Sequence, residues 1–227
     1  MRYSLILLLG LISLMANGQS RVFSGGLFPE AQLTYSPKDN LKLTAKIESQ
    51  HEMVRNSNET EADFGYNHDR TDFQGFIGTS INPFVSIAGG YQFRWDEGGE
   101  NSHRSIQQIS FVQRKAGYRL GHRVRTDQTF LSSDSPEFRL RYRFLSEIPL
   151  NGQRIDAGEF YLIASDELIS SIQSDEFNLE NRLVCSLGFN YSGKQKFEGG
   201  IDYRTDSFLD GGLRQRVWLK IGWFVTI

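Results

Sequence analysis

The chain has 227 residues, with 25 lysines and arginines against 27 aspartates and glutamates, a formal net charge of −2. The length suits one large domain, and the near balance of charge gives no general reason to expect nucleic-acid binding. Aromatic residues make up 13% of the chain, and 22 glycines with only 5 prolines favour strands. The mean hydropathy of −0.41 excludes a bundle of membrane helices. It does not exclude a membrane barrel, whose strands are apolar on one face only.

The N-terminal segment, "MRYSLILLLGLISLMANGQS", has a basic Arg2, an apolar core from Leu5 to Met15 and then small residues. This pattern predicts a signal peptide over residues 1–18, cleaved before Gln19. The core is short for a permanent membrane helix, so an uncleaved anchor is the weaker alternative. We therefore expect export through the Sec pathway, with residues 19–227 forming a single domain outside the cytoplasm.

Segments of about ten residues that alternate between apolar and polar side chains recur along the rest of the chain. Eleven such segments can be counted, starting near residues 22–35, and the clearest are 41–49, 85–95, 118–130, 138–144, 179–191, 197–206 and 213–227. A closed bacterial barrel usually has an even number of strands, so either the first segment lies outside the wall or a further strand lies within residues 55–72. The pattern predicts 10–12 strands.

The connections between these segments alternate in length. Short turn-like stretches at 36–40, 81–83, 114–117, 149–152 and 192–194 separate longer polar stretches at 55–72, 96–103, 131–136, 167–177 and 207–212. Alternating short and long connections are typical of an antiparallel up-and-down transmembrane β-barrel.

Two features favour a membrane barrel over a soluble periplasmic barrel or sandwich. The polar faces carry charges at mid-strand, as in "FRLRYRF" (138–144), where three arginines alternate with four apolar residues. Aromatic residues also gather near the ends of the apolar faces, where an interfacial girdle would lie. These are Tyr35, Tyr91, Phe93, Trp95, Tyr118, Phe130, Tyr191, Tyr203 and Trp223.

Several of these segments, taken in order, carry a resemblance to a known family. "HRSIQQISF", "LGHRVRTDQTF", "FRLRYRF", "IPLNG", "SDEL" and "NRLVCSLGFNY" resemble the outer-membrane family called domain of unknown function 2490, over roughly residues 85–227. The matching positions are Gln107 or Gln108, His122, Arg123, Arg125, Arg139, Arg141, Tyr142, Arg143, Asp166, Glu167, Asn181 and Arg182. The chain departs from the family pattern at Asp127-Gln128 and at Ser165-Asp166-Glu167. The resemblance implies location in the outer membrane of a Gram-negative bacterium and no established activity.

The arginines are the main candidate functional residues. A basic wall in the lumen is predicted from Arg119, Arg123, Arg125, Arg139, Arg141 and Arg143, and acidic lumen partners from Glu159, Glu167, Glu180, Glu198 and Asp202. Clustered like charges require partners. The pattern therefore favours a polar core of arginine–carboxylate pairs, with a permeation path for polar or anionic solutes as the second interpretation.

The function hypothesis is a small porin-like channel, with an occluded structural or adhesive barrel as the alternative. A third alternative is a lipid-modifying enzyme, since His103 and Ser105 would share one strand face, but no distinctive signature surrounds them. The sequence predicts no catalytic residue, cofactor or metal site, and Cys185 is interpreted as an apolar filler beside Leu183 and Leu187. The expected partners are outer-membrane lipid, the barrel assembly machinery and a small polar solute, but no nucleic acid.

Overall fold

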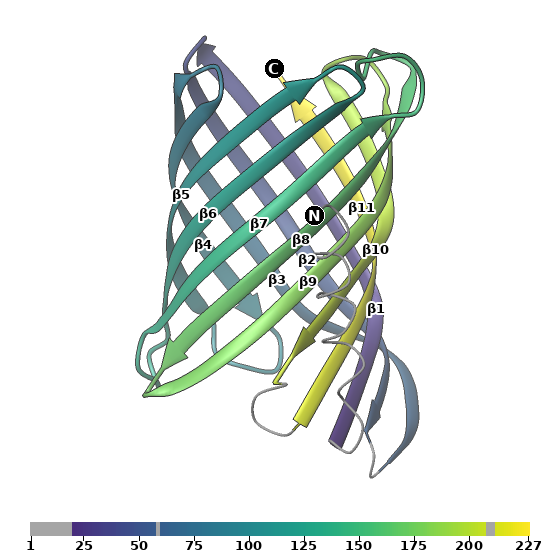
Figure 1. Ribbon diagram of the computed structural model, residues 1–227. Helices are drawn as coiled ribbons and strands as arrows, with labels where there is room; N and C mark the ends of the chain where they lie inside the picture. The colour runs from purple at the N-terminus through teal and green to yellow at the C-terminus, as the bar shows by residue number, and fades with distance from the viewer. Residues whose placement is uncertain (1–19, 58–59, 208–211) are drawn as a thin grey trace, which may run out of the picture.

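Eleven strands form a closed barrel in the computed structural model, which describes residues 20–57, 60–207 and 212–227 (Figure 1). They are β1 (Ser20–Lys38), β2 (Leu41–Ser57), β3 (Thr60–Asn82), β4 (Val85–Asp96), β5 (Ser102–Lys115), β6 (Tyr118–Phe130), β7 (Glu137–Pro149), β8 (Glu159–Gln173), β9 (Glu176–Asn190), β10 (Gln195–Asp206) and β11 (Gly212–Thr226). The all-β fold class and the barrel predicted from the alternating pattern are confirmed. The predicted signal peptide lies outside the described residues.

Each strand pairs antiparallel with the next in the chain, and β1 closes the barrel against β11. This closing pair is parallel, from Ser20 opposite Gly212 to Thr34 opposite Thr226. Eleven strands lie within the predicted range of 10–12, but the expectation of an even number was wrong. An odd number of strands in an up-and-down order leaves the first and last running in the same direction, so only a parallel ladder can join them.

Two of the predicted long connections are strand instead. Residues 55–57 and 60–72 continue β2 and β3, and residues 167–177 are the ends of β8 and β9 around a two-residue turn. The turn residues Ser174 and Asp175 have φ of 48° and 67°, the left-handed conformation that tight hairpins require. Conversely, the connection after β7 spans residues 150–158 and is longer than the predicted 149–152.

For the segment that begins β3, the reason is exposure on both faces. Phe64 and Tyr66 are 78% and 64% exposed, and all of residues 62–67 are exposed. A strand segment that meets water on both sides has no buried face, so hydrophobic periodicity does not mark it.

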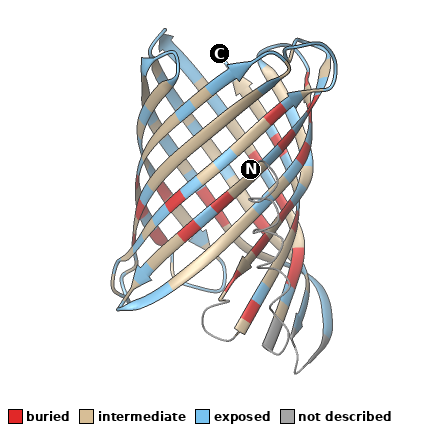
Figure 2. Cartoon of the chain, in the orientation of Figure 1, coloured by how far each residue is buried: buried red, intermediate tan, exposed pale blue. Residues whose placement is uncertain are grey.

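The inward face of the barrel is identified by contacts that skip a strand, since these are made only across the concave side. Arg123 in β6 reaches Glu167 in β8, with Nη2 and Oε1 2.6 Å apart. Tyr161 in β8 likewise donates to Glu198 in β10 at 2.8 Å. Buried and exposed positions alternate along the strands in Figure 2. The charged faces of the strands therefore line the interior.

The outward face is mainly apolar, as shown by Leu140 and Ile221, which are both 54% exposed. All nine aromatic residues predicted for a girdle lie on this face, and seven of them are exposed. Across the described part of the chain, no helix has the length and apolar character needed to cross a membrane.

Candidate functional site

The interior of the barrel is the first candidate site, and its arginines lie on two neighbouring strands. All six predicted wall residues alternate on the inward face of β6 and β7. In the register of this hairpin, Arg123 lies directly opposite Arg143, and Arg125 lies opposite Arg141. Like charges opposite one another destabilise a sheet, so neighbouring carboxylates are required.

The nearest of these carboxylates come from the same two strands. Arg141 Nε lies 2.5 Å from Asp127 Oδ2, and Arg119 pairs with Glu147. The sequence interpretation missed both acids because it looked for partners only in later strands. A usable signal was present, since Asp127 continues the inward positions of Arg123 and Arg125 along β6.

The predicted acidic residues of later strands take different positions. Glu167 contacts Arg123, and Glu180 lies 2.7 Å from Arg182 Nε on its own strand. Asp202 forms two hydrogen bonds with Arg204, of 2.9 and 2.7 Å. The other two predicted acidic residues, Glu198 and Glu159, have partners other than arginine.

Glu198 accepts a hydrogen bond from Tyr161, and Glu159 accepts one from the Asp156 amide at 2.9 Å. Glu159 lies at the end of the barrel that carries the 150–158 connection. The structure thus brings Glu167, Glu180 and Asp202 to arginines, and places Glu159 at the rim.

The opposite side of the barrel carries ion pairs that the sequence interpretation did not include. Glu30 Oε2 lies 2.9 Å from Lys46 Nζ, and its Oε1 lies 3.0 Å from Lys220 Nζ. Arg94 binds Asp72 through two hydrogen bonds of 2.7 and 2.9 Å. Charge pairing therefore runs around the whole interior and is not confined to the arginine wall.

Several side chains of the interior are almost completely buried. They are Trp218, Arg204, Tyr161, Ile106, Asp127 and Asp206. Three of the six are charged, so the interior is packed in large part by polar groups and stabilised by their pairing.

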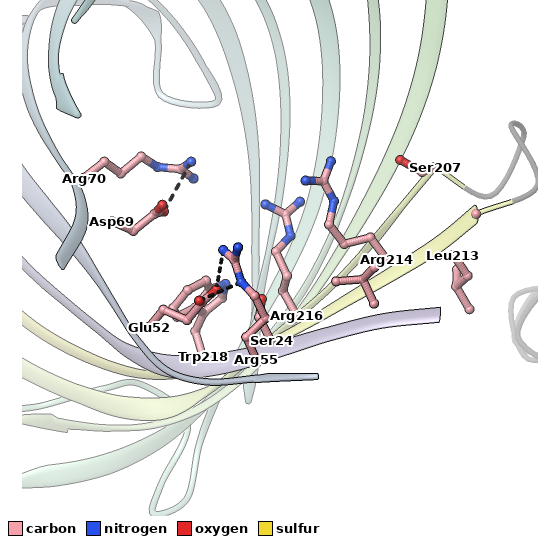
Figure 3. Close-up of a pocket in the computed structure, with 12 residues that line it drawn as sticks. Ser24, Glu52, Arg55, Asp69, Arg70, Ser207, Leu213, Arg214, Arg216 and Trp218 are labelled. Carbon is pink, nitrogen blue, oxygen red and sulfur yellow. Dashed lines mark hydrogen bonds and ion pairs between the residues drawn. The ribbon is translucent and has the colours of Figure 1, made fainter. Parts of the chain in front are cut away.

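Near the end of the barrel that carries the β2–β3 hairpin, the interior opens into a cavity of about 470 Å³, which we call the vestibule (Figure 3). Its lining comes from the ends of β1, β2, β3 and β11 and the residue after β10. It includes the charged residues Glu52, Arg55, Asp69, Arg70, Arg214 and Arg216. Four guanidinium groups thus face the vestibule with two carboxylates.

Unpaired polar atoms in the vestibule wall are all donors. Nε of Arg70, Nε of Arg216 and Nε1 of Trp218 are buried without a hydrogen-bond partner among the residues that the structure describes. The carboxylate nearest to Arg70 is that of Asp69, with 3.7 Å between Nη1 and Oδ2. Because each unmatched buried donor is unfavourable, this wall is chemically suited to a small solute rich in acceptor oxygens.

Within residues 20–57, 60–207 and 212–227, no group of three or more histidine, cysteine, aspartate or glutamate residues is arranged to hold a metal ion. His103 and Ser105, weighed as a catalytic pair, both lie on the outward face but bind other groups: His103 contacts Tyr91, and Ser105 donates to Gln128.

Comparison with known proteins gives one match. A family model described as "Protein of unknown function (DUF2490)" matches residues 26–211. No curated protein and no solved structure matches the chain.

Proposed function

Because the chain belongs to the DUF2490 family, whose description assigns no activity, we propose a function from the geometry. The protein is an outer-membrane barrel that takes up a small anionic solute in its vestibule, in the manner of a porin entrance. The observation that carries this proposal is the set of three unpaired buried donors, on Arg70, Arg216 and Trp218, around a cavity of about 470 Å³.

Membrane insertion is supported by the distribution of side chains. An apolar outward face with exposed aromatic residues would be unfavourable in water over so large an area, and it matches the lipid-facing band of an outer-membrane barrel. The apolar N-terminal segment ending in Ala16-Asn17-Gly18 supports export.

The proposal extends to passage of the anion through the barrel, beyond the vestibule. Arg125 hydrogen-bonds Gln108, and its guanidinium lies 5.5 Å from the centre of the Phe76 ring across the interior. No carboxylate among the described residues lies within 4.0 Å of Arg125 or Arg143. These two charges offer successive anion contacts beyond the vestibule.

A second candidate is an occluded barrel that binds a solute or a partner without transport. The observation that favours it is the close packing of the interior, where Trp218 is 2% exposed and Asp127 is fully buried. In this case, the vestibule would bind anions while purified protein would give no conductance.

The test uses the full chain, refolded in detergent, with inorganic phosphate as the probe. Arg70→Gln is the informative variant, because Arg70 has a long contact to its carboxylate and its removal leaves no tightly paired acid behind. We expect wild-type protein to bind phosphate in titration calorimetry and Arg70→Gln to bind at least ~10-fold more weakly, the effect of losing one charge-assisted hydrogen bond.

The matched control is Arg114→Gln, since Arg114 is an exposed arginine that contacts the Pro83 carbonyl at the opposite end of the barrel. Equal phosphate affinity in wild type and Arg70→Gln, or no binding at all, contradicts the vestibule proposal. Planar-bilayer recordings then separate the two candidates: anion-selective steps support passage, and a silent bilayer supports occlusion.

A further inference from the structure

A second polar cluster lies on the outward face, on β2, β3 and the start of the β4–β5 connection. Six side chains form one continuous chain of hydrogen bonds, which we call the outward relay: Tyr66, His51, Ser49, Thr71, His68 and Glu97. It is independent of the vestibule, because it faces away from the interior.

A β-bulge assembles this cluster. Gln50 pairs with Arg70 and His51 pairs with His68, so Asp69 has no residue opposite it. Without the extra residue, strict alternation along β3 would turn His68 inward, since Arg70 and Asp72 face the interior. The bulge re-aims His68 to the outward face, a role that bulges often have beside functional sites.

The first half of the relay has the geometry of a hydroxyl–histidine–carboxylate triad. His68 Nδ1 lies 2.8 Å from Glu97 Oε2, and His68 Nε2 lies 2.8 Å from Thr71 Oγ1. The two ring nitrogens therefore contact the acid on one side and the hydroxyl on the other, as in triads that activate a nucleophile.

The second half extends from Thr71 to a serine. Ser49 Oγ lies 3.0 Å from Thr71 Oγ1 and 3.0 Å from His51 Nε2, and it has a longer contact of 3.4 Å to the Arg70 carbonyl. His51 Nδ1 lies 2.9 Å from Tyr66 Oη. Thr71 is buried, whereas Ser49 is half-buried, so Ser49 is the hydroxyl that a substrate can reach.

The identity of the groups fixes the direction of the protons. An ionised Glu97 only accepts, so neutral His68 donates from Nδ1 and accepts at Nε2 from Thr71. Thr71 has then used its proton, so Ser49 donates to Thr71, and His51 Nε2 donates to Ser49. The tyrosine hydroxyl donates to the remaining ring nitrogen. In this arrangement the Ser49 proton is directed toward His68, through Thr71 at 3.0 Å, in preference to the more distant Arg70 carbonyl at 3.4 Å.

The relay lies at the level of the lipid headgroups if the barrel spans a membrane. Along the outward face of β2, Leu43, Ala45 and Ile47 precede Ser49, which is eight residues from the start of the strand. Eight residues of strand, tilted about 40°, rise about 20 Å, close to the edge of an apolar band about 25 Å tall. The Trp95 ring, 5.1 Å from that of His68, is the kind of side chain that marks this boundary.

We propose that the outward relay hydrolyses acyl esters of membrane lipids, whose ester groups lie at this boundary. Ser49 Oγ forms a bond to the acyl carbon, its proton passes to Thr71, and the Thr71 proton passes to His68 Nε2. The ester C–O bond breaks, and the departing alcohol takes the proton back by the same route. A water molecule then adds to the acyl carbon, the bond to Ser49 breaks, and the serine regains a proton. The products are one carboxylic acid and one alcohol.

The roles of the relay residues follow from these contacts. Ser49 is the nucleophile, Thr71 carries its proton, and His68 is the general base. Glu97 is a positioning residue, because it acts on the substrate only through His68. The Nε2–H of His51, which donates to Ser49 in the resting state, is close enough to bind the oxyanion that forms at the acyl carbonyl.

The test uses the full chain in mixed micelles that contain a fluorogenic phospholipid with hydrolysable acyl esters. We expect release of the fluorescent fatty acid by wild type, loss of this activity in Ser49→Ala, and a loss of about 10²–10⁴-fold in His68→Gln, the range that general acid–base groups contribute. A fluorophosphonate probe should label wild-type protein on Ser49, as located by peptide mass spectrometry. In Glu97→Gln, the acid limb of the rate profile should move to lower pH, which a purely structural effect would not produce.

Ser105→Ala is the matched control, because Ser105 is another outward serine two residues from a histidine but outside the relay. It should leave lipid hydrolysis and probe labelling unchanged. Folding of every variant is checked by its Trp fluorescence and heat-modifiable mobility. Folded wild-type protein that neither hydrolyses lipid nor reacts with the probe, or Ser49→Ala with undiminished rate, overturns the proposal. Neither result bears on phosphate binding in the vestibule.

Discussion

The inward and outward faces of the same strands both carry polar side chains, but these side chains find different kinds of partner on the two faces. Inside, full charges are paired, as with Asp127, which is fully buried, and Arg141, which is 6% exposed. Outside, the polar groups form mainly uncharged hydrogen bonds, as between Gln107 and Gln128 at 3.1 and 3.2 Å.

This difference reflects what surrounds each face. The interior holds only a few buried apolar side chains, such as Phe28, Ile106 and Trp218, beside a larger number of buried polar and charged ones. Ion pairs and their hydrogen bonds therefore fill much of it, and their role in packing is enough to explain them. In the proposed membrane setting, the outward face lies in an apolar environment, where polar residues are not needed for packing and are unfavourable. A polar cluster outside therefore points to function more strongly than the same residues inside.

The largest effect is expected from removing one member of an interior pair. Asp127→Ala leaves Arg141 buried without its closest partner, and we expect a loss of about 3–5 kcal/mol in the free energy of unfolding. Urea titration of the protein in lipid vesicles, followed by Trp fluorescence, measures this loss of stability.

The double variant Asp127→Leu/Arg141→Met tests the physical reason. It removes both charges together, so no unpaired charge stays buried. We therefore expect it to be more stable than Asp127→Ala. A double variant less stable than the single one would show that the interior needs these charges for something other than mutual compensation.

A smaller effect is expected from two adjacent glycines of β10 that point to opposite faces. A Cβ at Gly200 would lie 2.2 Å from the Cys185 carbonyl oxygen and 2.5 Å from Ser186 Cα, whereas a Cβ at Gly199 meets nothing within 4 Å. We expect Gly200→Ala to lower the free energy of unfolding by about 1–3 kcal/mol, as overpacking does. Gly199→Ala should leave it within about 1 kcal/mol of wild type. The same urea titration compares them, and equal stability of the two variants would contradict the close approach of β9 and β10.

The difference between the two faces also determines which parts of the fold the alternating pattern could predict. The alternation in "FRLRYRF" was sufficient to predict the strand and the side of Arg139, Arg141 and Arg143, because a period of two fixes which residues share a face. It could not predict the rim hairpin around residues 55–72, where both faces meet water, nor the parallel closure of β1 on β11, which depends on the total strand count.

The two candidate sites were less accessible to sequence reasoning. The vestibule depends on the meeting of β1, β2 and β3 with β11, at the other end of the chain. The outward relay depends on a single bulge residue, Asp69, that reverses the face of His68. A pattern reading that assumes strict alternation assigns His68 to the wrong face, so no spacing rule would have joined it to Thr71.

The smallest effect is expected at Asp166, a carboxylate of the outward face that lies outside the relay. Asp166 on β8 accepts a hydrogen bond of 2.7 Å from Asn181 Nδ2 on β9, and both are half-buried. Asn181→Leu should lower the free energy of unfolding by about 1 kcal/mol, the net contribution of one hydrogen bond. The double variant Asp166→Leu/Asn181→Leu should regain or exceed wild-type stability in vesicles, because two apolar side chains suit a lipid-facing surface better than the polar pair. If the double variant is instead less stable than Asn181→Leu, the outward face in this region is not in contact with lipid, and Asp166 must serve an interaction in a polar environment.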